Sequence, residues 1–303
     1  MFDLRVPRIK SLSFGLFCLC GAVLIGPANA DNAEFPPGGV DSASSTLDLL
    51  TKWFAISDVA KESQPHWMTP LVTVTPRLEQ EYRYDQGWQA RTKDVNIDNY
   101  DSGKGLEIIP TANTELIIGA PAYQVKSTPK GRVEGWADET MLGKYRFIAG
   151  NEENGNYIIT GFLGYSFPTG NSAFSSNKGI VTPTIAAGRG WGTREKGFDI
   201  QSTVSIAIPT ENEQQIGTVT TWNTSLQAHV FGKFWPEIEA SRTWYRDGDH
   251  AGKNQLALTA GLIAGRYNLG SRARLILGAG CQWPVSNIRI YERNWLATAR
   301  VAF

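Results

Sequence analysis

Apolar and polar residues alternate with a period of two along most of this chain, from about residue 78 to its end. In the clearest segment, Phe198 and Ile200 fall on one face and Asp199 falls on the other. Helical periodicity is nearly absent in this region, and polar or Gly-rich turns separate about twelve such segments. The pattern predicts an all-β protein built from amphipathic strands.

The connections between these segments alternate in length. The expected strands lie near residues 78–85, 105–109, 114–125, 139–149, 156–167, 179–192, 197–208, 219–233, 236–245, 253–267, 272–283 and 291–303. Every odd-numbered connection, beginning with 86–104 and 126–138, is longer than the even-numbered ones, such as 110–113. Outer-membrane barrels combine long extracellular loops with short periplasmic turns. The chain is therefore expected to form a transmembrane antiparallel up-and-down β-barrel of about 12 strands.

Aromatic residues gather near the ends of the expected strands, as the two interfaces of a membrane barrel require. Those expected at periplasmic ends are Tyr145, Phe147, Trp191, Trp235, Tyr267 and Phe303, and those expected at extracellular ends are Tyr165, Phe167, Trp222, Trp244 and Trp283. The final Phe303 is in phase with the apolar face of the last strand. A terminal aromatic in this position is typical of the assembly signal of bacterial outer-membrane proteins.

The first thirty residues have the features of a secretory signal peptide. A basic start is followed by an apolar run over 12–25 and by the small residues Ala28 and Ala30. The alternative is a single helical anchor, which the short, Gly-interrupted run disfavours. We therefore expect residues 1–30 to be a signal peptide, residues 31–77 a periplasmic or plug segment with a short helix, and residues 78–303 a barrel in the cell outer membrane.

Composition excludes several other classes of protein. The chain has 303 residues, is 42% hydrophobic and 19% charged, and has a formal net charge of zero, so neither disorder nor nucleic-acid binding is indicated. Beyond residue 30 no apolar stretch is long enough for a membrane-spanning helix. Loss of the signal peptide would remove Arg5, Arg8, Lys10 and Asp3, leaving a net charge of −2. Only Cys281 would remain as a thiol, so no intramolecular disulfide is expected.

Residues 135–170 resemble a known family. The resemblance rests on a Gly and Asp entrance, a Lys-Tyr-Arg-Phe strand and a strand that ends in Pro-Thr-Gly, namely Gly135, Trp136, Ala137, Asp138, Gly143, Lys144, Tyr145, Arg146, Phe147, Gly161, Gly164, Tyr165, Phe167, Pro168, Thr169 and Gly170. This pattern is similar to the outer-membrane β-barrel family described as transporters of the phenol-degradation MetA pathway. The resemblance implies movement of small solutes, including aromatic or apolar compounds, across the outer membrane.

The sequence offers no catalytic or metal site. A barrel hydrolase needs a Ser nucleophile beside a His, and His229 has no Ser two positions away in its strand. His250 lies in an Asp- and Gly-rich stretch that is typical of a hairpin turn. We therefore expect no enzyme activity, no cofactor and no metal.

Ionisable residues within the strands are the better functional candidates. A charge on the lipid face would cost about 2–4 kcal/mol at the bilayer midplane, so these residues are expected to face the lumen. The lumen-lining candidates are Glu79, Glu81, Arg83, Lys144, Arg146, Asp199, His229, Glu239, Arg272, Arg274 and Arg300. They would line either a polar channel or a narrow barrel filled by salt-bridged side chains. Arg242 falls on the apolar face, which predicts either a bulge or an interfacial position where the side chain snorkels.

These features favour a monomeric outer-membrane channel or transporter that passes small solutes. Its expected partners are outer-membrane lipid and lipopolysaccharide, the barrel assembly machinery and a small-molecule solute, with no nucleic acid. Two alternatives stay open at this point. One is a membrane-embedded enzyme acting on lipid, and the other is a structural or surface-contact barrel whose extracellular loops carry the function.

Overall fold

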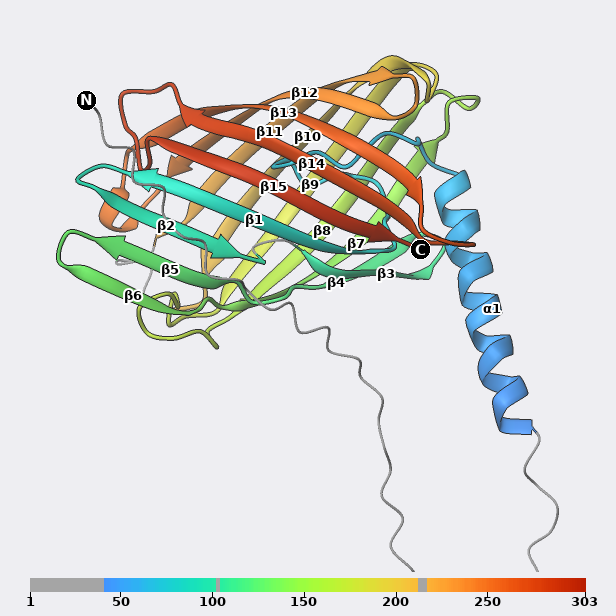
Figure 1. Cartoon of the computed structure of the whole chain (residues 1–303), viewed down its shortest axis with the longest axis horizontal. Helices are drawn as coiled ribbons and strands as arrows, with labels where there is room; N and C mark the ends of the chain where they lie inside the picture. The colour runs from blue at the N-terminus through green and yellow to red at the C-terminus, as the bar shows by residue number, and fades with distance from the viewer. Residues whose placement is uncertain (1–40, 102–103, 212–216) are drawn as a thin grey trace, which may run out of the picture. The chain divides into compact units, whose positions relative to one another are not determined.

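The structure is a computed structural model that describes residues 41–101, 104–211 and 217–303, with side chains from residue 51 onward. Twelve antiparallel strands form a closed barrel, and pairing of the last strand with the first closes it. The expected fold class is confirmed (Figure 1). The longer strands of the ring are β7 (Glu139–Gly150), β8 (Tyr157–Phe167), β9 (Ile180–Gly192), β10 (Lys196–Pro209), β11 (Val219–Val230), β12 (Phe234–Tyr245), β13 (Asn254–Asn268), β14 (Arg274–Pro284) and β15 (Arg293–Ala302).

Three consecutive wall strands next to β1 (Glu81–Arg91) are each broken in two. The pieces are β2 (Val95–Tyr100) and β3 (Gly105–Thr111), β4 (Thr114–Ile118) and β5 (Tyr123–Thr128), and β6 (Gly131–Trp136) with β7. β3, β4 and β7 complete the ring between β1 and β8, whereas β2, β5 and β6 extend the sheet from the other half of β1. Figure 1 shows β2, β5 and β6 side by side at one end of the barrel.

The prediction of two long loops is wrong. Residues 86–104 contain the end of β1 and the whole of β2, and residues 126–138 contain the whole of β6. The turns 92–94 and 129–130 are consequently as short as those at the other end. The sequence pattern missed β6 because most of this strand lacks an alternating buried face. Residues Gly131–Glu134 of β6 are exposed on both faces, so no selection for period-two hydrophobicity acts on them.

Burial in the wall is the reverse of that in a water-soluble protein. Phe198 and Ile200 on the outer face are 47% and 38% exposed, whereas Asp199 and Gln201 between them are fully buried. The outer surface carries many large apolar side chains, and the inner surface carries amides, hydroxyls and charges. A continuous exposed apolar surface of this kind requires an apolar surrounding. Trp235 was expected on this outer surface, and that prediction is wrong because its side chain is fully buried on the inner side.

The barrel has two distinguishable ends. The C-terminal rim is the end where Phe303 lies, and it carries the tight turns that follow β3, β7, β9, β11 and β13. The far rim is the opposite end, with connections such as 168–179 and a 3-10 turn, η1 (Gly248–His250). One helix, α1 (Asp41–Glu62), precedes the barrel, as expected for residues 31–77. No helix among the described residues has the length and apolar character needed to cross a membrane.

Candidate functional site: a barrel lumen filled by residues 63–80

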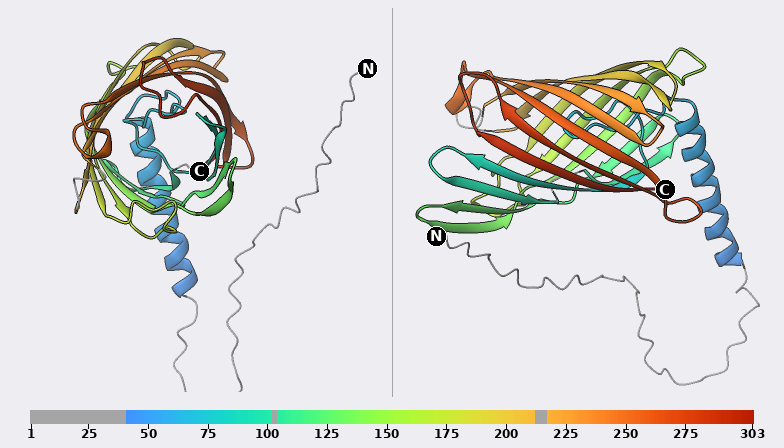
Figure 2. Two further views of the ribbon diagram at one scale, coloured as in Figure 1. Left: turned by 90° about the vertical axis from the view of Figure 1, so that its left-hand side faces the viewer. Right: turned by 45° about the horizontal axis from the view of Figure 1, so that its top comes forward.

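Residues 63–80, here called the inner segment, run inside the barrel between α1 and β1. Figure 2 shows this segment within the ring of strands when the barrel is viewed along its length. Trp67, Thr75 and Leu78 are fully buried, and Met68 and Leu71 pack with Trp235 of β12. The Gln64 side chain accepts the N–H of Leu78 at 2.9 Å and donates to its C=O at 2.7 Å. The segment therefore forms a loop whose two ends are joined.

Arginines of the wall hold the carbonyl groups of the inner segment. Arg300 of β15 donates to the C=O of Thr69 at 2.7 Å, and Arg83 of β1 donates to that of Leu71 at 2.9 Å. Arg266 of β13 donates to the C=O of both residues 66 and 67 at 2.9 Å. These bonds satisfy backbone acceptors that would otherwise be buried without partners.

Glutamates hold the amide groups of the same segment. Glu237 of β12 accepts the N–H of Leu71 at 3.0 Å, and Glu239 accepts the N–H of Val72 at 2.8 Å and of Thr73 at 2.6 Å. Carboxylates at β12 and guanidinium groups at β1 and β15 therefore bind one short stretch of backbone. Bonds to a charged partner are stronger than neutral ones, so the loop has a defined position in the lumen.

Glycines on the inner face of two wall regions make room for the largest side chains of the loop. At Gly188 and Gly190 of β9, a Cβ atom would overlap the indole ring of Trp67. At Gly261 of β13, a Cβ atom would overlap Leu71 in the same way. The Trp67 indole also donates to Asn156 at 2.8 Å. These glycines are required by close approach, since any side chain would push the loop away from the wall.

Buried ionic pairs complete the lumen. Lys144 of β7 lies 3.0 Å from Glu115 of β4, and both side chains are fully buried. His229 of β11 contacts Asp199 of β10 at 2.8 Å through Nε2 and the C=O of Thr193 at 2.8 Å through Nδ1. An ion pair in this setting needs hydrogen bonds on its remaining polar atoms to offset desolvation, and the loop supplies some of them. Lys144, for example, also donates to the C=O of Arg77 at 3.1 Å.

Contacts at the C-terminal rim connect α1 and the start of the loop to the wall. Lys61 donates to the C=O of Phe303 at 2.7 Å. Glu152, in the turn after β7, accepts from the N–H and the Nδ1 of His66 at 2.8 Å each. Burial alone would raise the pKa of Glu152, but the hydrogen bonds from His66 outweigh it and lower this pKa to about 2. The Glu152 carboxylate is therefore ionised at neutral pH.

Most of the expected lumen-lining residues lie on the inner face. Arg83, Lys144, Arg146, Asp199, His229, Glu239 and Arg300 are buried there, together with Glu81 at the start of β1. Glu79 is also buried, but it belongs to the inner segment and pairs with Arg77 at 2.8 Å. Arg146 donates to the C=O of Ala60 in α1 at 2.8 Å.

Two of the expected lumen residues lie at the C-terminal rim: Arg272 is outside the strands, and Arg274 is at the rim end of the inner face, where it lines a cavity with Glu79 and Glu81. Arg272 is in the turn before β14, partly exposed, and its guanidinium pairs with Asp58 of α1 at 2.6 Å. Arg274, the first residue of β14, donates to carbonyl groups of the same turn. The alternating pattern was extended two positions too far here, because β14 begins at Arg274. Arg242 stays on the outer face without a bulge, donates to Asn254 at 3.1 Å and lies over the Trp244 ring, as its interfacial alternative predicts.

Sequence reasoning missed several charged residues of the lumen. Glu107, Glu115 and Glu237 are buried and share the inward phase of their strands. Continuing the alternation through β3, β4 and β12 would have found them. A plug within residues 31–77 was one of the alternatives expected from the sequence, but its contacts with the wall were not predicted, because residues 67–75 contain no periodicity that could indicate partners more than a hundred residues away.

The described residues contain no group of three His, Cys, Asp or Glu side chains placed to hold a metal ion. Around His229, the bonded partners are Asp199 and the Thr193 carbonyl, and neither provides a hydroxyl nucleophile. The side chains around His229 therefore provide charges and hydrogen-bond partners, and they do not form a pair of a hydroxyl nucleophile and a base.

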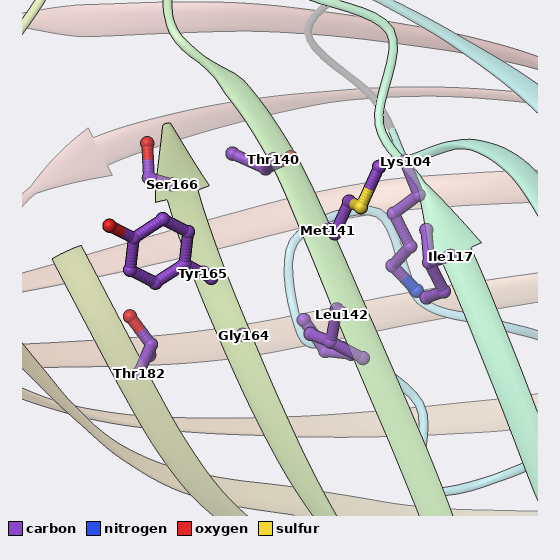
Figure 3. Close-up of a pocket in the computed structure, with 10 residues that line it drawn as sticks. Lys104, Ile117, Thr140, Met141, Leu142, Gly164, Tyr165, Ser166 and Thr182 are labelled. Atoms are coloured by element: carbon purple, nitrogen blue, oxygen red, sulfur yellow. The ribbon is translucent and has the colours of Figure 1, made fainter. Parts of the chain in front are cut away.

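A pocket lies beside the inner segment near the far-rim ends of β7 and β8 (Figure 3). Its volume is about 260 Å³. The lining is mainly apolar, from Ile117 of β4, Leu142 of β7 and Val74 of the inner segment. Polar residues also line it: Thr140, Ser166, Thr182 and Lys104, together with Met141, Gly164 and Tyr165.

No protein-family model and no curated protein sequence matches the chain. Among solved structures, the chain is similar to an outer membrane channel from Pseudomonas putida F1, with 14% identity, a TM-score of 0.47, and coverage of 73% of this chain and 93% of that one. It is also similar to the NanC porin, with 11% identity, a TM-score of 0.44, and coverage of 73% and 98%. The beta domain of the Bordetella autotransporter BrkA gives 11% identity, a TM-score of 0.42, and coverage of 74% and 98%.

Proposed function

We propose that this chain is an outer-membrane channel for small solutes, and that the inner segment closes its lumen in the state described here. The observation that carries the proposal is the reversed burial of the wall, with Phe198 and Ile200 exposed and Asp199 and Gln201 buried. An apolar outer surface requires lipid, and a polar inner surface is suited to water and polar solutes once the loop moves. Twelve strands enclose more room than the eight whose interior side chains fill completely.

The mode of attachment supports a loop that can leave the lumen. The inner segment has no covalent tie to the wall other than its two chain ends, and hydrogen bonds to Arg83, Arg300, Glu237 and Glu239 hold it. In water, the same charged side chains would be solvated without the loop. The cost of releasing the loop is therefore offset by hydration of the lumen.

In this proposal the C-terminal rim faces the periplasm and the far rim faces the exterior, as short turns and longer loops are arranged in outer-membrane barrels. Assignment to the family of transporters of the phenol-degradation MetA pathway is part of the proposal and rests on residues 135–170. The role of Phe303 as a signal to the barrel assembly machinery, and of lipopolysaccharide as the outer-leaflet partner, also belongs here.

The proposal is tested by reconstituting the full chain in liposomes and measuring swelling with sugars, organic acids and aromatic compounds. Parallel planar-bilayer recordings in KCl detect the pore directly. We expect intermittent current steps and uptake of at least one class of solute. A barrel that inserts, resists heat in detergent, and gives neither current nor swelling would contradict the proposal.

A further inference from the structure

The pocket beside the inner segment lies where the wall strands are interrupted. Lys104 ends the break between β2 and β3, and Thr140 and Met141 follow the break between β6 and β7. Gly119, in the third break, approaches Thr140 so closely that its N–H donates to the Thr140 C=O at 2.8 Å and a Cβ would overlap the Thr140 hydroxyl. Because loops replace regular strand here, the inner face is hollow rather than filled by alternating side chains.

The apolar part of the pocket is large enough for one compact molecule. Ile117 is 3% exposed, and it lines the pocket together with Leu142 and Val74. An engineered apolar cavity of about 150 Å³ stays free of water and binds benzene. At about 260 Å³, this pocket has room for a single ring or short branched chain with a polar substituent.

The Lys104 ammonium is the one cation on the wall of this pocket, and it lacks a hydrogen-bond partner among the described residues. Its side chain is 16% exposed, and its Nζ lies 3.9 Å from a carboxylate oxygen of Glu107, which is close enough for an ion pair but beyond hydrogen-bonding distance. Lys144 on the neighbouring strand is different, because it contacts both Glu115 and the C=O of Arg77. A buried ammonium group with unused donors is costly unless an acceptor reaches it.

We infer that this pocket binds a small monocarboxylate with a compact apolar body, its carboxylate paired with Lys104 and its body packed against Ile117 and Leu142. The inference rests on the proposed channel function, since the pocket lies between the inner face of the wall and Val74 of the inner segment, near the far-rim ends of β7 and β8. A carboxylate supplies the acceptor that the ammonium lacks, and the apolar body covers the carbon-rich wall. The hydroxyl groups of Thr140, Ser166 and Thr182 can form further hydrogen bonds with the bound molecule.

An occupant of this pocket would contact the segment that closes the lumen. Val74 belongs to the inner segment, and its neighbours Val72 and Thr73 are held by Glu239. Solute in the pocket and the closed position of the loop are therefore coupled by direct contact. The pocket acts as the first binding site that a solute meets on its way to the closed part of the lumen.

The test uses the full chain in detergent and isothermal titration calorimetry with benzoate, and with benzyl alcohol as its neutral counterpart. We expect saturable benzoate binding that weakens at least tenfold in Lys104→Gln and is retained in Lys104→Arg. Benzyl alcohol binding should not change in Lys104→Gln. Lys178→Gln is the matched control, because this partly exposed lysine pairs with Glu211 outside the pocket.

A second pair of variants tests the apolar half of the site. Leu142→Trp fills the pocket and should abolish binding of both compounds, whereas Leu163→Trp, on the exposed outer face of β8, should leave both unchanged. Retained heat-modifiable migration of each variant shows that the barrel is folded. Absence of benzoate binding, or equal binding by Lys104→Gln, would overturn the inference. KCl current from the unmodified chain would remain in that case, so failure of this inference is distinguishable from failure of the channel function.

Discussion

Glu239 of β12 accepts the backbone N–H of Thr73 at 2.6 Å, across 166 residues of sequence. The same carboxylate accepts the N–H of Val72, and Glu237 accepts that of Leu71, so two side chains of one strand bind three consecutive amides. β12 therefore binds the backbone of this stretch through two carboxylates, while Trp235 of the same strand packs against the side chains of Met68 and Leu71. In the proposed channel, both kinds of contact hold the inner segment in the lumen.

Replacement of both glutamates by glutamine should loosen the loop. Each charge-assisted bond contributes about 1.5–3 kcal/mol, and every 1.4 kcal/mol changes an equilibrium tenfold. We expect the Glu237→Gln, Glu239→Gln double variant to raise the open probability in planar bilayers by about tenfold or more. Glu134→Gln, at an exposed position of β6, is the control and should behave as the unmodified chain. An unchanged open probability in the double variant would show that these bonds do not hold the closed state.

The glycines of β9 that lie against the Trp67 indole allow a steric test of the inner segment. Gly188→Val places a side chain where the indole ring lies, so Trp67 must leave the wall and enter water. We expect a red shift of tryptophan fluorescence and more frequent current steps. Gly143→Val adds the same side chain at a glycine of β7 with open space around it, and should give neither change. Identical spectra for the two variants would contradict the placement of Trp67.

Acid should weaken the contact between Glu152 and His66. The pKa of Glu152 is lowered to about 2 in the folded chain, against about 4.3 in an unfolded one. Its contribution is thus fully present above about pH 4.3 and is lost as the pH falls through about 2. We expect current steps to become more frequent between about pH 4 and pH 2, and less so in Glu152→Gln, which does not titrate. The same rise in the variant would assign the acid response to other groups.

Replacement of Arg272 and of Arg300 by alanine should have very different effects on stability and on current. Arg272→Ala removes a partly exposed pair with Asp58 and should change the free energy of unfolding by less than about 1 kcal/mol, with no change in current. Arg300 is fully buried and holds the carbonyl groups of Thr69 and Pro70. Arg300→Ala should lower the urea midpoint and destabilise the closed state. Equal effects of the two variants would contradict the assignment of Arg272 to the rim.

The alternating pattern predicted the barrel because lipid and lumen act on every second residue of a strand. It worked best where this constraint is strongest, as in β10, where Asp199 and Gln201 separate outward-facing apolar residues. It failed at β6, where residues 131–134 are exposed on both faces. The expected aromatic belt, in contrast, failed at Trp235, which has the inward phase of Glu239 and packs against Met68 and Leu71.

The contents of the lumen could be predicted only in part. Inward phase identified Arg83, Glu239 and Arg300 as lumen residues, because charge on the lipid face is costly. The contacts of these residues with the backbone of residues 69–73 could not be predicted. A backbone amide is present at nearly every position, so the sequence does not indicate which amide a side chain will bind. Lys104 was missed because it lies in a strand break, where the alternating pattern stops.

Whether the inner segment closes a pore is tested by single-channel conductance with and without this segment. A chain lacking residues 31–76 keeps every strand from β1 to β15, and its heat-modifiable migration reports whether the barrel forms. We expect this chain to show a larger and permanently open conductance in KCl, whereas the full chain opens intermittently. Equal conductance and equal open probability in the two folded chains would contradict the claim.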